Sequence, residues 1–387
     1  GKLKKINLKL NPGSFPSPIK WTHALDKRKT FLCPLVAGRY FKNVKNKSSP
    51  DWLQKRLISI GLRPISSLVD ITNYITYDLG RPLHVFDADK INGNLSMRMA
   101  KDSEECVTLD GKKQKLNNNM IVIADSSRVH AIGGIMGGEE SACTENTTNV
   151  FLEVALFDSI NISKTGKNLD VQSDARYRFE RGIDPNSVEI GLNVATKMIL
   201  DLCGGEVSKI TNSRNYSFKS KNIKYHYDKV THLAGIKVNK ERQKKILTKL
   251  GFKILNKKNN SCNIIIPGWR LDIDGEADIV EEIVRIFGYD NIKPIPVLKQ
   301  ITDQIKPLNS QQSVRYQSKR LIASRGYHEV VTWSFMSSKY ANYFNLYDNF
   351  VKLDNPISSD LDIMRPSILP NLLESVNKNH ARLFDSF

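Results

Sequence analysis

Short apolar runs of strand length alternate with amphipathic helical stretches along much of this chain, and that mixture limits its fold more than any other feature. Met120–Ala124 and Val150–Val154 are apolar runs, as is typical of buried strands. Val188–Leu202 instead carries apolar residues at helical spacing and is followed by Gly204 and Gly205, which act as a glycine stop. No motif recurs at a spacing of 20–50 residues, which excludes a solenoid. The sequence therefore predicts an α+β fold.

The 387 residues are enough for two or three domains. Residues 1–30 contain three prolines, and we interpret them as the tail of a truncated N-terminal domain. A mixed domain is predicted over 31–212, a smaller one over 222–293, and the start of a further α+β domain over 308–387. The polar or proline-containing stretches between them are predicted linkers. The chain begins without methionine, so we expect it to be a piece of a longer protein.

The third part is predicted to be a small winged-helix-like unit. Asn239 is placed to cap an amphipathic helix over Lys240–Leu250. Two strands, Phe252–Leu255 and Cys262–Ile266, are expected to flank a polar turn, and an acidic helix should cover 276–287.

Charge and cysteine content narrow the function class. The formal net charge is +18, and the first 60 residues carry +12 of it. A basic segment of this kind attracts phosphate, although a lysine-rich proteome would give the same excess, and charge alone does not decide. The five cysteines are never spaced as CxxC, which favours a reducing cytoplasm and argues against structural zinc or a disulfide framework. No apolar stretch approaches the roughly 20 residues of a membrane span.

Four parts of the sequence resemble, in the same order, the β subunit of bacterial phenylalanyl-tRNA synthetases. The first three are similar to the editing domain of that family, and the fourth to the domain that follows it. A single stretch would be a weak motif, whereas four in register over more than 200 residues are specific. They are GLRPISSLVDITNYITYDLGRPLHVFD (61–87), GGIMGGEES (133–141) with NVFLEVALF (149–157), SDARYRFERGIDP (173–185) and PGWRLDIDGEADIVEEIVRIFGY (267–289).

The resemblance implies a multidomain α+β chain: a mixed α/β editing domain, a winged-helix-like domain and the start of a class II synthetase-like domain, marked by NPISSDLDIMRPSILP (355–370). It also implies a ligase subunit that supports ATP-dependent attachment of phenylalanine to tRNA(Phe) by an α subunit in an α2β2 heterotetramer. The subunit's own reaction would be hydrolysis of tyrosine mischarged onto that tRNA. ATP is expected to be used by the holoenzyme and not to bind this part alone.

The need for such editing follows from physical chemistry. An apolar pocket for phenylalanine cannot strongly reject a ligand that adds one hydroxyl. A second site that offers a hydrogen-bond partner to the phenol selects tyrosine, because phenylalanine leaves that partner unpaired.

The resemblance assigns editing-site roles residue by residue. Glu153 matches the residue that recognises the tyrosine hydroxyl. His84 matches the family's editing-site histidine, which we expect to hold the terminal adenosine or position the attacking water. Thr72 and Asn73 have side chains able to order that water, although Asn73 could also be a turn residue. The remaining matches are to positions that line the pocket or contact the tRNA end: Arg63, Gly134, Gly137, Ser173, which stands where many members have threonine, and Ala175, whose small size leaves room for the ring.

Structural explanations compete with each of these roles. Glu153 lies inside an apolar run, where a salt bridge to a core arginine such as Arg178 would also explain it. A lone histidine such as His84 is more often part of a core or surface, and GGIMGG could be a strand–turn device. No Ser/His/Asp or Cys/His arrangement is evident, so we expect direct attack by a positioned water and not covalent catalysis.

Six acidic residues fall within 11 positions, from Asp272 to Glu282. Carboxylates one helical turn apart share a face and suit Mg²⁺, whereas acids at a helix start are also favoured by the macrodipole alone. The resemblance assigns a magnesium site, shared with the α subunit, to Asp272, Asp278, Glu281 and Glu282.

Two other functions are compatible with the sequence. The chain could be a non-catalytic scaffold that binds RNA and the α subunit with an inactive editing pocket. It could also be a Mg²⁺-dependent phosphodiesterase built on the acidic cluster, although no base or second metal set accompanies those carboxylates.

Overall fold

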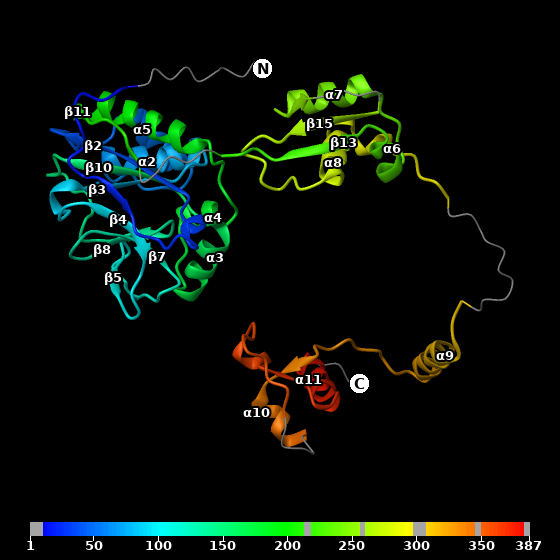
Figure 1. Ribbon diagram of the computed structural model, residues 1–387. Coiled ribbons are helices and arrows are strands. Elements are labelled where there is room, and N and C mark those ends of the chain that lie inside the picture. The colour runs from blue at the N-terminus through cyan, green and yellow to red at the C-terminus, as the bar shows by residue number, and fades with distance from the viewer. Residues whose placement is uncertain (1–10, 213–217, 256–259, 297–306, 345–349, 383–387) are drawn as a thin grey trace. The chain divides into compact units, whose positions relative to one another are not determined.

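The computed structural model describes residues 11–212, 218–255, 260–296, 307–344 and 350–382. The chain separates into two compact units, residues 1–294 and 295–387 (Figure 1). The described elements mix strands and helices in both units, in agreement with the predicted α+β class. No helix in these ranges combines the length and the apolar character that crossing a membrane requires.

The first unit contains two five-stranded sheets, which form most of the predicted editing domain. In the first sheet β1 pairs with β4 in parallel and the other neighbours are antiparallel. Its order is β1 (Trp21–His23), β4 (Leu95–Met99), β7 (Ile121–Ala124), β8 (Val129–Ile132) and β9 (Met136–Gly137). A short hairpin, β5 (Glu105–Val107) with β6 (Lys113–Lys115), stands apart from this sheet.

The second sheet is antiparallel throughout. Its order is β11 (Glu206–Val207), β2 (Leu35–Lys42), β10 (Val150–Leu156) and β3 (His84–Asp87), with β12 (Thr211–Asn212) also paired to β2.

Strand β10 is buried on both faces, and its side chains point alternately into two separate cores. Phe151 and Ala155 belong to the core shared by the two sheets, whereas Leu152 and Val154 belong to a second core beneath helices. The Trp21 and Phe151 rings meet edge to face at 5.5 Å between centroids. The second core is covered by α1 (Asp51–Ser59), α2 (Ser67–Asp78) and α5 (Ser187–Cys203), which lie over the β2–β10 sheet in Figure 1.

The N-terminal segment corrects the predicted boundary at residue 30. Ile19, Trp21 and Leu25 are buried in the core between the sheets, and β1 pairs with β4. This part of residues 1–30 is therefore not a tail but packs within the domain predicted over 31–212, because its apolar side chains complete that core. Residues 1–10 lie outside the described ranges.

Two helices flank the sheets near the end of β10. Asp158 caps α3 (Ser159–Asn168) by accepting a hydrogen bond from the Asn161 N–H. Ser173 does the same for α4 (Asp174–Phe179) through the Arg176 N–H. These side chains satisfy donors that a helix start leaves open.

The smaller domain is a three-stranded antiparallel sheet with three helices, in the strand order β13–β15–β14. The predicted helices, the Asn239 cap and both predicted strands are present, with ends within one residue. β13 and α6 were not predicted, because both are short and carry mixed polar and apolar residues. The elements are β13 (Asn222–His226), α6 (Lys229–Ala234), α7 (Lys240–Lys249), β14 (Lys253–Leu255), β15 (Ser261–Ile265) and α8 (Glu276–Phe287).

The second unit has a small core among its described residues, formed by Met336, Ala341 and Ile363. Several large apolar side chains are exposed there, Val331 and Ile357 by 96% each. Its elements are α9 (Ser310–Ser324), β16 (Phe335–Met336), α10 (Ser338–Ala341), β17 (Ile363–Met364) and α11 (Leu369–His380).

Candidate active site

The strand register places the two principal candidate residues side by side. Glu153 on β10 lies opposite His84 on β3 and opposite Gly38 on β2. Because side chains alternate along a strand, Glu153 shares the inter-sheet face with Phe151, and His84 shares it with Phe86. Directly opposed residues on one face are cross-strand neighbours. The fold thus directs a carboxylate and an imidazole into the layer between the sheets.

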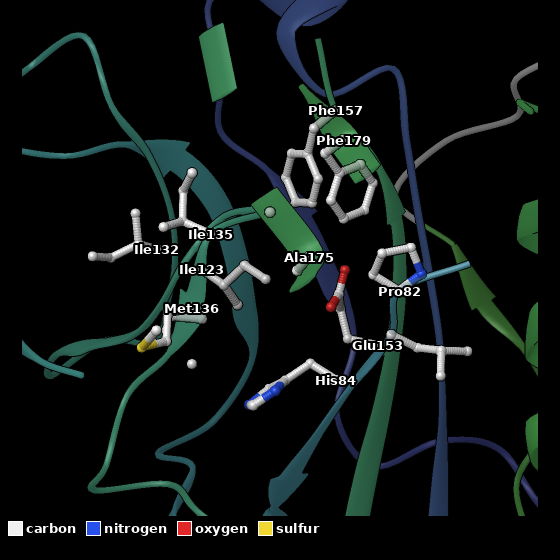
Figure 2. Close-up of a pocket in the computed structure, with 14 residues that line it drawn as sticks. Pro82, His84, Ile123, Ile132, Ile135, Met136, Glu153, Phe157, Ala175 and Phe179 are labelled. Carbon is white, nitrogen blue, oxygen red and sulfur yellow. The ribbon is translucent and has the colours of Figure 1, made fainter. Parts of the chain in front are cut away.

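A pocket opens at this point. Figure 2 shows the Glu153 carboxylate and the His84 ring at this pocket, with Phe157 and Phe179 side by side at another part of its wall. Those two rings meet edge to face at 5.1 Å between centroids. The lining is mainly apolar: Pro82, Leu83, His84, Ile123, Ala131, Ile132, Gly134, Ile135, Met136, Gly137, Glu153, Phe157, Ala175 and Phe179.

Glu153 is only 6% exposed, and its Oε1 atom has no hydrogen-bond partner. Burial raises the pKa of this carboxyl to about 7, although Arg81 acts in the opposite direction. No ion pair to Glu153 within 4 Å is found among the described residues. A buried carboxylate in that state is costly unless a ligand supplies a partner.

The proposed salt bridge to Arg178 is wrong. Arg178 binds Asp174 at 3.1 Å, one helical turn away, and its guanidinium lies over the ring of Tyr77. The Asp174–Arg178 spacing of four residues on a helix was a signal for this pair.

Arg81 is the arginine that acts on Glu153, and no sequence pattern indicated its role. Its side chain is fully buried and donates to the carbonyl oxygen of Ala155, two residues after Glu153. Burial lowers the pKa of Arg81 to about 10, and the charges of Glu153 and Asp184 oppose that change. The guanidinium keeps its charge at neutral pH and contributes positive potential beside the pocket.

His84 has a neutral imidazole at physiological pH. Burial, with a smaller effect from the nearby His130, lowers its pKa to about 4. The Nε2 atom is buried without a partner, and the ring packs edge to face on Phe86 at 4.5 Å between centroids. His84 can therefore offer an uncharged ring nitrogen to a hydrogen-bonding ligand or water.

Two glycines of the GGIMGG segment allow close approach at the pocket. A Cβ atom on Gly137 would lie 2.6 Å from Nε2 of His84. Any other residue at this position would therefore clash with the His84 ring, and only glycine avoids the clash. Gly134 has a φ of +68°, and a Cβ there would lie 2.8 Å from Cδ1 of Ile162. Both glycines, with Ala175 at the start of α4, line the pocket as predicted.

Four other predicted site residues do not line the pocket. The Ser173 hydroxyl donates to the Ile135 carbonyl at 2.6 Å, which ties α4 to the glycine segment. The Thr72 hydroxyl donates to the Val69 carbonyl within α2. Asn73 is partly exposed on α2, and Arg63 is exposed before it. A role for Thr72 and Asn73 in ordering water is therefore not supported by this geometry and stays a prediction.

The carboxylates of the acidic helix α8 already have partners in the chain. Glu282 is buried and binds Arg270 at 2.7 Å and Arg285 at 2.8 Å. Asp272 accepts two hydrogen bonds from Arg270. The Asp278 carboxylate accepts from backbone N–H groups at the helix start.

This arrangement does not fit a metal site. The described ranges contain no group of three or more His, Cys, Asp or Glu side chains that could hold a metal ion. Arginines and backbone donors occupy the oxygens that Mg²⁺ would need, and Glu281 is exposed. The predicted set of Asp272, Asp278, Glu281 and Glu282 is therefore not assembled by this chain alone.

Three family models match the chain: the B3/4 domain over residues 32–204, the tRNA synthetase B5 domain over 223–289, and the phenylalanyl tRNA synthetase beta chain CLM domain over 295–387. The phenylalanine–tRNA ligase beta subunit of Mesorhizobium japonicum is 46% identical over 379 residues, 98% of this chain and 47% of that protein. The chain belongs to the phenylalanyl-tRNA synthetase β-subunit family. This chain is also 44% identical to the phenylalanine–tRNA ligase beta subunit of Rhodopseudomonas palustris over 382 residues, 99% of this chain and 47% of that protein.

The chain spans about half the length of the curated relatives it matches. An N-terminal fragment of the phenylalanyl-tRNA synthetase beta-subunit from Pyrococcus horikoshii is similar at a TM-score of 0.36 and 16% identity, over 73% of this chain and 79% of that one. A likeness at that level supports no inference about the fold. All of the pocket residues lie inside the B3/4 match, and α8 lies inside the B5 match.

Proposed function

We propose that this chain hydrolyses the ester of tyrosine mischarged onto tRNA(Phe), as the editing part of a phenylalanine–tRNA ligase β subunit. The observation that carries the proposal is the Glu153 carboxylate, which is buried at an apolar pocket with Oε1 unpartnered. A ligand that brings a hydroxyl donor to this oxygen removes the cost of leaving it unpaired.

Selectivity for tyrosine follows from that single partner. The tyrosine ring would lie among the apolar lining, and its phenol would donate to Glu153. Phenylalanine fills the same space but leaves the carboxylate unpaired. A hydrogen bond to a charged group contributes about 1.5–3 kcal/mol, which corresponds to about 10- to 150-fold between the two esters. Ala175 and the two glycines keep the pocket open for the ring.

The hydrolysis itself requires a water to attack the ester carbonyl carbon. The bond between that carbon and the ribose oxygen of the terminal nucleotide then breaks, the ribose oxygen takes a proton, and free tyrosine and uncharged tRNA leave. The neutral His84 ring would hold the attacking water or the terminal adenosine through Nε2. No covalent intermediate is needed in this scheme.

The activity of the whole protein is part of the same proposal. The chain would support ATP-dependent attachment of phenylalanine to tRNA(Phe) by an α subunit in an α2β2 assembly in the cytoplasm. ATP would be used by that holoenzyme. Residues 31–212, extended to include β1, would form the editing domain, 222–293 the winged-helix-like domain, and 308–387 the start of the catalytic-like domain.

A magnesium site shared with the α subunit would require a change of partners. Asp272, Asp278 and Glu282 would have to exchange their present hydrogen bonds for Mg²⁺ when α binds beside the exposed Glu281. Such an exchange is a condition of the proposal and enters no step of the hydrolysis.

The decisive experiment measures deacylation of Tyr-tRNA(Phe) and Phe-tRNA(Phe) by the purified chain. Glu153→Ala is expected to lose about 10- to 150-fold of the preference for the tyrosyl ester while the fold survives. Ala175→Trp should stop hydrolysis of either ester, because its bulk fills the pocket.

Wild-type rates and preference in Glu153→Ala would overturn the role of Glu153. If the wild-type chain binds tRNA but hydrolyses neither ester, with or without α, the alternative of a non-catalytic scaffold is correct. Unfolding of Glu153→Ala would make Glu153 a structural charge, and Glu153→Gln, which preserves shape, would then test selectivity.

A further inference from the structure

An exposed aromatic and arginine cluster joins α1 to α2 on the surface of the editing domain. The ring of Trp52, 44% exposed, meets the Tyr74 ring edge to face at 5.8 Å between centroids. The Arg56 guanidinium lies 5.4 Å from the Trp52 ring centroid and 5.6 Å from that of Tyr74, and it donates to the Tyr74 hydroxyl at 2.6 Å. None of these residues enters the hydrolysis described above.

A third aromatic residue, Tyr77, continues this surface toward the pocket. Tyr77, 38% exposed, stands three residues after Tyr74 on α2, so the two rings share a helix face. The Tyr77 hydroxyl donates to Asp174 at 2.7 Å, at the start of α4. The next residue, Ala175, lines the pocket. The exposed rings therefore connect α1, through α2, to the element that forms one wall of the pocket.

Two arginines of α1 and of the connection after it have no carboxylate partner among the described residues. Arg56 and Arg63, the latter in the connection between α1 and α2, are both exposed and make no ion pair within 4 Å with the described residues. Acids are also near: Asp174 is bound by Tyr77 and Arg178, while Asp51 and Asp78 are exposed. Arg56 contacts the rings of Trp52 and Tyr74 but pairs with no carboxylate, and the Trp52 ring is 44% exposed. Arginine beside exposed aromatic rings is a combination that binds single-stranded nucleic acid, because bases stack on the rings and phosphates pair with arginine.

We propose that this aromatic–arginine strip, Trp52, Arg56, Tyr74 and Tyr77, binds the unpaired 3′-terminal nucleotides of the tRNA whose ester the pocket hydrolyses. The inference rests on the proposed editing function. It assigns the strip to guiding the nucleotides that precede the terminal adenosine, whereas the pocket residues act on the ester and its amino acid. A purely structural role, in which Arg56 only fastens α1 to α2, predicts no effect on RNA.

The test measures binding of the full chain to a fluorescent eight-nucleotide single-stranded RNA with the 3′ sequence of tRNA(Phe), by anisotropy at fixed salt. Loss of one stacking ring is expected to weaken binding about 5- to 150-fold in Trp52→Ala, with Trp52→Phe close to wild type. Phe31→Ala is the matched control, because Phe31 is an exposed ring, 61% accessible, on the same domain but outside the strip.

A kinetic comparison separates this inference from the proposed function. If both hold, Trp52→Ala raises KM for Tyr-tRNA hydrolysis and leaves kcat near wild type. If folded Trp52→Ala has the RNA affinity and the KM of the wild type, the proposal that the strip binds RNA is wrong, even if the wild-type chain edits normally. An inactive wild-type chain overturns the editing function, while the RNA comparison still decides the strip.

Two further outcomes are decisive. If Trp52→Ala unfolds, the exposed Arg56→Gln takes its place, and RNA affinity equal to wild type then overturns the proposal. If the variants lose binding to a protein partner but not to RNA, the strip is a protein interface and the proposal is wrong.

Discussion

The pocket between the sheets and the acidic helix α8 both carry ionisable residues that matched family site positions, yet their surroundings differ. At the pocket, Oε1 of Glu153 and Nε2 of His84 are buried without partners. Along α8, Glu282 is equally buried but binds two arginines. Burial raises the pKa of Glu153 to about 7, whereas its arginine partners hold the pKa of Glu282 below the usual range.

The polar atoms of the pocket are available to a ligand, whereas the carboxylates of α8 are already paired within the chain. An unpaired buried group costs stability and persists where it serves a function, whereas a paired one needs no other explanation. The pocket is therefore the stronger candidate site of the two. Four measurements test this difference between the pocket and α8.

The largest effect is expected for His84→Ala. Loss of a group that positions the attacking water should lower the deacylation rate about 100- to 10,000-fold, for the tyrosyl and phenylalanyl esters alike. Single-turnover deacylation with each ester measures it, and Phe31→Ala provides the control. A fall of less than about tenfold, or one confined to a single ester, would contradict the role proposed for His84.

The next effect concerns stability and pH. The native pKa of Glu153, about 7, lies above its ordinary value, so folding takes up a proton between about pH 4.5 and 7 and stability falls as pH rises through that window. Glu153→Gln stays neutral and should be more stable than wild type at pH 8, by up to about 3 kcal/mol, with the difference vanishing near pH 4. Urea unfolding of both proteins at pH 8 and pH 4 measures this difference. Equal stability of variant and wild type at pH 8 would mean that the ionised Glu153 carboxylate does not destabilise the fold.

The acidic helix should show the opposite pH dependence. Arg270→Ala removes one of the two arginines bound to Glu282 and should destabilise the smaller domain by about 2 kcal/mol at neutral pH. The native pKa of Glu282 is lowered, so this stabilisation is present above the ordinary carboxyl pKa and is lost as pH falls below it. Urea unfolding of wild type and variant at pH 7 and pH 3 would reveal this, and a pH-independent difference would argue against it.

Sequence patterns identified the elements with strong periodicity. The predicted helix over 276–287 has the bounds of α8, and Val188–Leu202 differs from α5 by one residue at each end, because a long amphipathic face can be buried in only one way. β1, β13 and α6 are too short to show a period. Their place depends on tertiary contacts such as that of Trp21 with Phe151.

The site was predictable in type but not in detail. Glu153, His84, Gly134, Gly137 and Ala175 line one pocket, and their roles in hydrolysis stay predictions. Arg81 was missed, because no local pattern shows which arginine the fold will bury beside a distant strand. The arginines that bind Glu282 and Asp272 are near them in sequence, but only the fold shows that they occupy the oxygens assigned to magnesium.

The smallest effect, and the one that tests the acidic helix as a site, is expected for Glu281→Ala. Glu281 is exposed, so the substitution should change the stability of the chain by no more than about 0.5 kcal/mol. If the carboxylates exchange arginine for Mg²⁺ at the α contact, the variant should assemble with α less well than wild type in low magnesium and recover in high magnesium. Sedimentation of the two chains with α at both concentrations measures this. Equal assembly of variant and wild type throughout would leave α8 as a paired, solvated acidic helix, because a ligand of the ion cannot be removed without a magnesium-dependent cost.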